Sequence, residues 1–116
     1  MDIHRFYRSF HYALEGMMHI LSKHQNIRFH IVIAIVALLL AAFLHISRIE
    51  YLFIILAIFL VIISEMINTA IEEMVNLITT EHRKEAKIAK DVAAAAVLLS
   101  SIMAIIIGLV IFIPHL

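Results

Sequence analysis

The chain of 116 residues contains no cysteine, no tryptophan, one proline and only two glycines. The absence of cysteine excludes a disulfide framework, a thiolate metal site and a thiol nucleophile. Because Gly16 and Gly108 are the only glycines, neither GxGxxG nor GxxxxGK can occur, which excludes the usual glycine loops that bind phosphate. The formal net charge is zero, which argues against a nucleic-acid partner.

Hydrophobic residues are abundant instead: they make up 64% of the chain, and the mean hydropathy is +1.03. Such a composition is typical of a membrane protein rather than of a soluble core. The length is enough for one small domain, so we expect residues 1–116 to form a single all-α integral membrane domain.

Residues 3–23 have the pattern of an amphipathic helix. One half of the helical wheel carries apolar side chains, namely Ile3, Phe6, Phe10, Ala13, Leu14, Met17, Ile20 and Leu21. The other half is polar and basic, which predicts a helix lying in the membrane interface. The alternative is a helix packed on a soluble core, but little soluble chain is left to form one.

Three apolar segments follow, and each is long enough to cross a bilayer. We expect spanning helices at 27–45, 49–79 and 92–113, with a charged connection at 80–91. Basic residues flank the start of the first span and fill the connection, whereas only Arg48 lies at the other side. The positive-inside rule therefore predicts a multi-pass membrane protein with its N-terminus and connection in the cytoplasm.

The second span contains a polar stripe within the sequence SEMINTAIEEMVN. Glu65, Asn68 and Glu72 are spaced i, i+3, i+7, and Asn76 falls on the same helix face. An ionisable group inside a membrane helix costs about 2–3 kcal/mol on insertion scales, so a functional role is expected. If the helix enters the bilayer near Tyr51, Glu65 lies just inside it, and Glu72 lies at or beyond the headgroups.

Carboxylates at this depth beside basic residues suit a divalent metal that carries phosphates. Phosphoryl transfer requires positioning, charge neutralisation and a base near the acceptor hydroxyl. An acceptor arriving from the bilayer would meet Glu65 first, so Glu65 is the natural base. These residues therefore indicate phosphorylation of a lipid hydroxyl.

Each polar residue also has an ordinary structural interpretation. Asn68 could hydrogen-bond between helices, and Glu72 and Asn76 could form a solvated helix end. Lys90 could be an interfacial anchor and Asp91 an N-cap for the third span. A small proton-coupled transporter that uses Glu65 is a further alternative.

Two motifs resemble those of the prokaryotic diacylglycerol kinase family, which includes undecaprenol kinases. The first motif comprises Glu65, Asn68, Thr69, Ala70, Ile71, Glu72 and Val75, and the second comprises Ala89, Lys90, Asp91 and the alanines that follow. The resemblance covers essentially the whole chain, with the surface helix, three spans and charged connection in the expected order.

The resemblance implies a homotrimer with active sites between subunits, and transfer of phosphate from ATP with Mg²⁺ to a lipid alcohol. By position, Glu65 matches the proton acceptor and Glu72 a metal ligand. The positions that match nucleotide contacts are Arg5, Tyr12, Glu72, Glu81, His82, Arg83, Lys90 and Asp91. The absence of tryptophan and the ending GLVIFIPHL are similar to the undecaprenol kinase branch, which favours undecaprenol over diacylglycerol.

The sequence departs from the family pattern at two positions. Asn76 stands where the family has aspartate, and His24 stands where it has a metal-sharing glutamate, although Asn26 and His30 match. We therefore expect a metal site of Glu72 and His24, supported by Asn68 and Asn76, that holds Mg²⁺ or Mn²⁺. Because these two differences remove negative charge from the site, a second hypothesis stays open. The chain would then be a member of the family that binds nucleotide or lipid and catalyses little.

Overall fold

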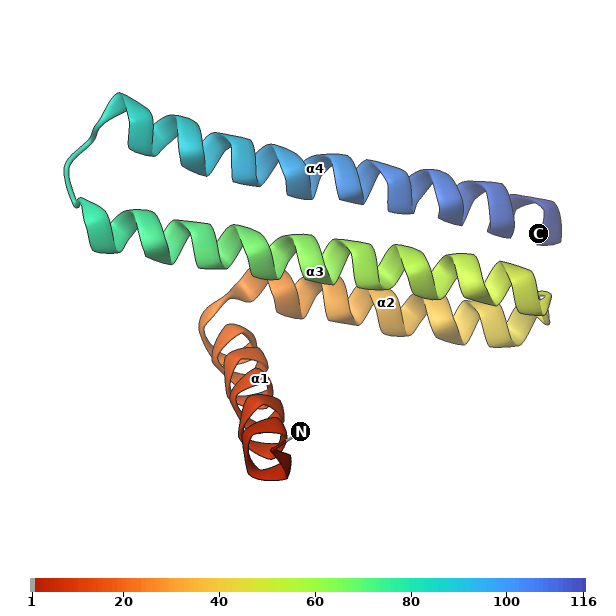
Figure 1. The fold of residues 1–116 in the computed structure, drawn as a ribbon. Helices are drawn as coiled ribbons and strands as arrows, with labels where there is room; N and C mark the ends of the chain where they lie inside the picture. The colour runs from red at the N-terminus through yellow and green to blue at the C-terminus, as the bar shows by residue number, and fades with distance from the viewer. Residues whose placement is uncertain (1) are drawn as a thin grey trace.

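The computed structural model describes residues 2–116, and these form four α-helices and one 3₁₀ turn (Figure 1). The helices are α1 (Ile3–Lys23), α2 (Gln25–Leu44), α3 (Arg48–Ile78) and α4 (Lys84–Phe112), and the turn η1 is Ile113–His115. No strand occurs in this part of the chain. The predicted all-α fold is confirmed.

Helices α2, α3 and α4 run side by side, and α3 contacts both of the others (Figure 1). All three are long and apolar enough to cross a membrane. Their outward side chains are exposed, among them Phe43, Leu39 and Leu99. A large apolar surface without protein cover requires lipid around it, so the chain is a membrane protein.

The apolar packing is tightest at the end of the bundle where α2 turns into α3. Ala41, Ile46, Ile54 and Ile111 form a buried cluster there. The C-terminus lies at the same end (Figure 1), where His115 Nε2 is 3.0 Å from Glu50 Oε2. The bundle is closed at this end. The polar stripe of α3 lies toward the opposite end.

The turn between α2 and α3 is defined by its capping groups. Ser47 and Glu50 form a capping box: the Ser47 hydroxyl accepts from the Glu50 backbone N–H, and the Glu50 carboxylate accepts from the Ser47 N–H. His45 ends α2 in the left-handed region with φ of 52°. The backbone N–H groups of His45 and Ile46 donate to the carbonyls of Ala42 and Ala41.

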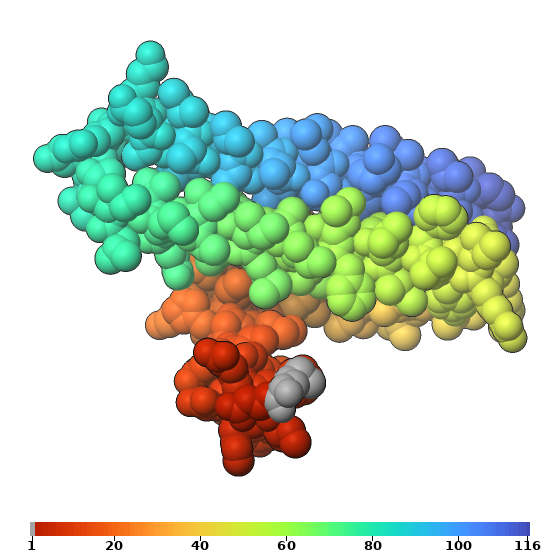
Figure 2. Space-filling model, viewed as in Figure 1, coloured from red at the N-terminus to blue at the C-terminus, as the bar shows by residue number. Residues whose placement is uncertain are grey.

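Helix α1 leaves the bundle at a steep angle and projects from it (Figures 1 and 2). Ile20 is its only buried residue, while Phe6 and Phe10 are 63% and 61% exposed. Apart from its end at Ile20, its apolar face is therefore left uncovered by the rest of the chain, which agrees with the predicted amphipathic surface helix. Asp2 caps its start by accepting from the N–H groups of His4 and Arg5.

The charged connection is shorter than predicted, because α4 begins at Lys84 rather than at residue 92. Only residues 79–83 are non-helical there. Alanine, lysine and glutamate favour helix, and residues 84–91 consist mainly of them, so their charge does not prevent helix formation. Asp91 lies inside α4, and the interpretation of Asp91 as an N-cap is wrong; Arg83 holds that position.

Candidate active site

The polar stripe on α3 runs from a buried end to an exposed one. Glu65 and Thr69 are buried, Asn68 and Glu72 are half-buried and Asn76 is exposed. The Asn68 Nδ2 donates to Glu72 Oε1 over 3.2 Å. Glu65 and Glu72 are seven residues apart on the helix, which separates them by about 10 Å along its axis. The two carboxylates therefore lie at different depths.

Glu65 has a partner on the neighbouring helix. His30 Nε2 of α2 lies 3.1 Å from Glu65 Oε1, and the Glu65 side chain is only 8% exposed. A buried carboxylate is costly unless it is hydrogen-bonded, so His30 stabilises it in place. From the sequence, His30 was identified only as a position that matches the family pattern, and its contact with Glu65 was not predicted.

Asn68 has an unused acceptor beside Glu72. Its Oδ1 is buried and has no hydrogen-bond partner within residues 2–116. A buried acceptor without a partner is unusual and calls for an explanation. Together with the Glu72 carboxylate, it places two oxygen donors of the kind that Mg²⁺ prefers at one point of the helix.

Five of the predicted nucleotide contacts meet at a single cavity of about 540 Å³ on the hairpin between α3 and α4. Its lining consists of Glu81, His82, Arg83, Lys84, Ala86, Lys87, Lys90 and Asp91. Four of these side chains are cationic. The charges are partly paired: Lys87 Nζ is 2.6 Å from Asp91 Oδ2, and Arg83 Nε is 3.3 Å from Glu81 Oε2.

Lys90 connects this cavity to the polar stripe. Its Nζ donates to Asn76 Oδ1 over 2.7 Å, joining α4 to α3. Asn76, predicted as a supporting residue, therefore orients the lysine predicted to contact nucleotide. The two motifs, which are separate in the sequence, are adjacent in the fold.

Arg5 and Tyr12 are not brought to this cavity within one chain. Both lie on α1 and are exposed, and neither lines the cavity. Their predicted nucleotide contact stays a prediction.

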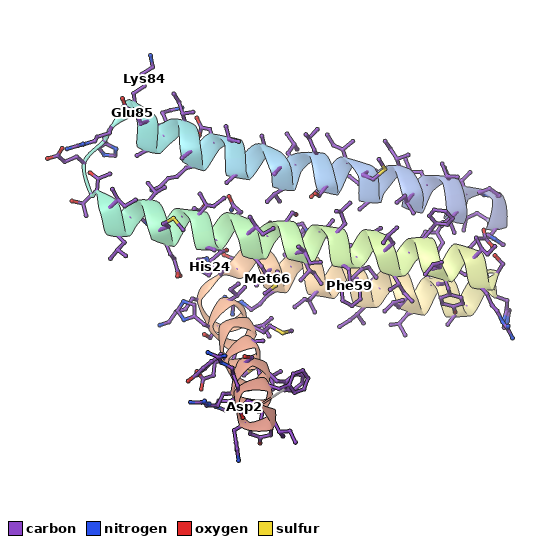
Figure 3. The ribbon with its side chains drawn as sticks, in the orientation of Figure 1. Asp2, His24, Phe59, Met66, Lys84 and Glu85 are labelled. Carbon is purple, nitrogen blue, oxygen red and sulfur yellow. The ribbon has the colours of Figure 1, made fainter. Side chains whose placement is uncertain are left out.

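His24 lies at the bend between α1 and α2 (Figure 3), and its neighbour is not the one expected. His24 Nε2 is 3.7 Å from Glu73 Oε1, and His19 Nε2 is 3.1 Å from the same oxygen. Across residues 2–116, Glu72 joins no group of three potential metal ligands. The structure therefore does not bring His24 and Glu72 together, and sequence reasoning missed His19 and Glu73.

A second cavity, of about 400 Å³, lies between α2, α3 and α4. Its lining is apolar except for His30 and Ser101. The imidazole of His30, which lines this cavity, also contacts the buried carboxylate of Glu65.

Comparison with known proteins identifies the family of the chain. The family described as "Prokaryotic diacylglycerol kinase" matches residues 11–112. The chain is 39% identical over 115 residues to the undecaprenol kinase of Bacillus subtilis, covering 99% of this chain and 94% of that protein.

Other relatives are named diacylglycerol kinase. The diacylglycerol kinase of Synechocystis is 38% identical over 109 residues, covering 93% of this chain and 62% of that protein. The diacylglycerol kinase of Escherichia coli K12 is 33% identical over 84 residues, covering 72% of this chain and 69% of that protein. The chain therefore belongs to the prokaryotic diacylglycerol kinase family, a family of membrane lipid kinases.

Proposed function

We propose that the chain transfers the γ-phosphate of ATP to the hydroxyl of a membrane lipid alcohol, with undecaprenol as the acceptor. The observation that carries the proposal is the buried Glu65, held by His30 of the apolar cavity and two helical turns from Glu72, with Lys90 of the cationic cavity bound to Asn76 one turn beyond Glu72. An apolar acceptor and a polyanionic donor need such adjoining but different surroundings. Diacylglycerol is the second candidate, because the relatives carry both names.

In the proposed reaction, Glu65 accepts the proton of the lipid hydroxyl while the hydroxyl oxygen attacks the γ-phosphorus. The new bond joins the lipid oxygen to phosphorus, the bond between the γ-phosphorus and the bridging oxygen breaks, and ADP leaves. His30 keeps the Glu65 carboxylate oriented. The cations Arg83, Lys84 and Lys90 would attract and hold the phosphates.

A divalent metal of the reaction would be held by oxygens on α3. Glu72 and the unpartnered Asn68 Oδ1 fit Mg²⁺ in donor type. When bound, the metal neutralises charge on the phosphates. His24 does not fit this set, because its ring lies beside Glu73 and Mg²⁺ prefers oxygen donors. The binding of the metal, the binding of ATP and the residues assigned to each are all part of what we propose.

The assembly and membrane orientation are also proposed. Arg5 and Tyr12 are exposed on α1, away from the cavity on the α3–α4 hairpin. A homotrimer with active sites between subunits would let α1 of one subunit reach the site of another. The basic residues at the start of α2 and on the α3–α4 hairpin favour a cytoplasmic site in a bacterial plasma membrane.

The test is transfer of labelled phosphate from ATP in mixed micelles that contain either undecaprenol or diacylglycerol, with Mg²⁺ or Mn²⁺. We expect Mg²⁺-dependent transfer with undecaprenol preferred. Glu65→Gln should lower the rate at least about 100-fold, as expected for loss of a general base. Glu85→Gln is the matched control, because Glu85 is exposed on α4 and lies outside the cavity lining (Figure 3).

Three results would count against the proposal in different ways. Full activity in Glu65→Gln would show that Glu65 is not the base. Preferential transfer to diacylglycerol would show that diacylglycerol, rather than undecaprenol, is the acceptor. ATP binding without transfer to either lipid, under either metal, would favour the second hypothesis of a binding protein with little catalysis, which the residues Asn76 and His24 motivate.

A further inference from the structure

Three potential metal ligands from three parts of the chain converge where α1 meets the bundle. His19 lies near the end of α1, His24 lies at the bend before α2, and Glu73 lies on α3. One ligand atom from each lies within 4.8 Å of the other two. All three side chains are exposed or half-buried, so an ion can reach them from water.

The local backbone explains why the two imidazoles meet. His24 is in an extended conformation, with φ of −117° and ψ of 116°, and this residue breaks the helix. It occupies the N-cap position of α2, yet its side chain makes no capping hydrogen bond. The ring is therefore available to turn toward Glu73, and it sits edge-on to the His19 ring with centroids 6.5 Å apart.

This cluster differs from the other histidine–carboxylate pairs of residues 2–116. His11 with Glu15, His30 with Glu65, and His115 with Glu50 each place one imidazole beside a carboxylate. At Glu73 two imidazoles approach the same carboxylate oxygen. Across this part of the chain it is the only group of three potential ligands.

The donor set selects the class of ion. Two imidazoles and one carboxylate suit Zn²⁺ and similar transition-metal ions, whereas Mg²⁺ prefers oxygen. With bonds of about 2.0–2.1 Å, ligand atoms around a tetrahedral zinc ion lie about 3.3 Å apart. The present distances from Glu73 Oε1, 3.1 and 3.7 Å, are close to that value. The third distance, between the two imidazoles, is within 4.8 Å.

We propose that His19, His24 and Glu73 bind a transition-metal dication of the zinc class, with water at the fourth position, and that the ion joins α1 to α3. Ile20 is the only buried residue of α1, so the ion would be a principal link between this helix and the bundle. The site is separate from Glu72 and Asn68 and does not depend on the proposed kinase reaction.

The test uses the purified full chain in detergent, without a polyhistidine tag and stripped of metal, titrated with Co²⁺. Tetrahedral Co²⁺ gives strong visible absorption. We expect one equivalent to bind, Zn²⁺ to displace it, and excess Mg²⁺ to leave it in place. Loss of a supporting hydrogen bond around a metal costs about 10- to 100-fold in affinity, so removal of a ligand should cost at least about 100-fold.

The variants are His19→Ala, His24→Ala and Glu73→Gln, and each should weaken binding by that factor. His11→Ala is the matched control, because His11 is an exposed histidine of α1 paired with a carboxylate; its affinity should not change. The proposal would be overturned if the chain bound neither Co²⁺ nor Zn²⁺, or if Mg²⁺ readily displaced the bound ion. It would also be overturned if the three variants bound the ion as tightly as the unchanged chain does. Since no lipid or ATP is present, failure here leaves the kinase proposal untouched.

Discussion

The imidazole of His30 on α2 lies 3.1 Å from the carboxylate of Glu65 on α3, in a part of the bundle where Glu65 is almost fully buried. This contact joins α2 to the proposed base on α3. His30 is also one of the two polar residues that line the apolar cavity. His30 is therefore placed to position Glu65 rather than to touch the phosphates.

Replacing His30 tests this positioning role. His30→Ala removes a hydrogen bond to a charged group, worth about 1.5–3 kcal/mol, so kcat should fall about 10- to 100-fold. The KM for ATP should change little, because the nucleotide cavity does not include His30. His30→Gln keeps a side-chain donor and should recover part of the loss. Steady-state kinetics in mixed micelles measures both constants, and unchanged kcat in His30→Ala would contradict the role.

Lys90→Met tests the cationic cavity. The variant removes one cation from the lining and the hydrogen bond to Asn76. A hydrogen bond that involves a charged group, such as one from Lys90 to a phosphate, is worth about 1.5–3 kcal/mol, so the KM for ATP should rise about 10-fold or more. Arg48→Met removes a cation at the opposite end of α3 and serves as the control. Equal KM values in the two variants would exclude Lys90 from nucleotide binding.

Asn76→Asp tests the departure from the family pattern. The change would turn the hydrogen bond with Lys90 into an ion pair and restore a negative charge near the proposed metal position. We expect the Mg²⁺ concentration for half-maximal activity to fall several-fold, since Mg²⁺ sites are built from carboxylates and phosphates. Thr80→Asp adds the same charge at an exposed nearby position. A similar fall in that variant would show that general charge, rather than position 76, is responsible.

His45→Gly tests the turn between α2 and α3. His45 has φ of 52°, a conformation that costs a residue with a Cβ atom about 1–2 kcal/mol and costs glycine little. Glycine there should raise the thermal unfolding midpoint in detergent by about 3–5 °C. His45→Ala keeps the Cβ atom and should not raise it. A lower midpoint in His45→Gly would mean that the imidazole itself stabilises the turn.

Much of the fold follows from the sequence because its signals are local. The apolar segments predict the spans, the wheel of residues 3–23 predicts α1, and the i, i+3, i+7 spacing places the stripe of Glu65, Asn68 and Glu72 on one face. The start of α4 was missed because charge was interpreted as a loop signal, although residues 84–91 are good helix formers.

The contacts between helices are harder to predict, since they depend on register and angle. His30 and Glu65 lie at similar distances along the chain from the turn at His45–Ser47, so an antiparallel pairing of α2 and α3 could have suggested their contact. The meeting of His19, His24 and Glu73 could not be inferred in this way. It depends on the angle at which α1 leaves the bundle, and a spacing of five residues does not place two histidines on one helix face.

Helix α3 has 31 residues without interruption, so its length of about 46 Å exceeds the hydrocarbon thickness of about 30 Å. Because the helix is continuous, the heights of Glu65 and Glu72 above the bilayer centre are fixed together. In the proposed reaction, the protein then discriminates between acceptors by the height of their hydroxyl above the bilayer centre as well as by the tail below it. The level that a hydroxyl reaches then adds to the fit of the tail in deciding which alcohol is phosphorylated, and a thinner or thicker bilayer should change the rate without any change in the binding residues.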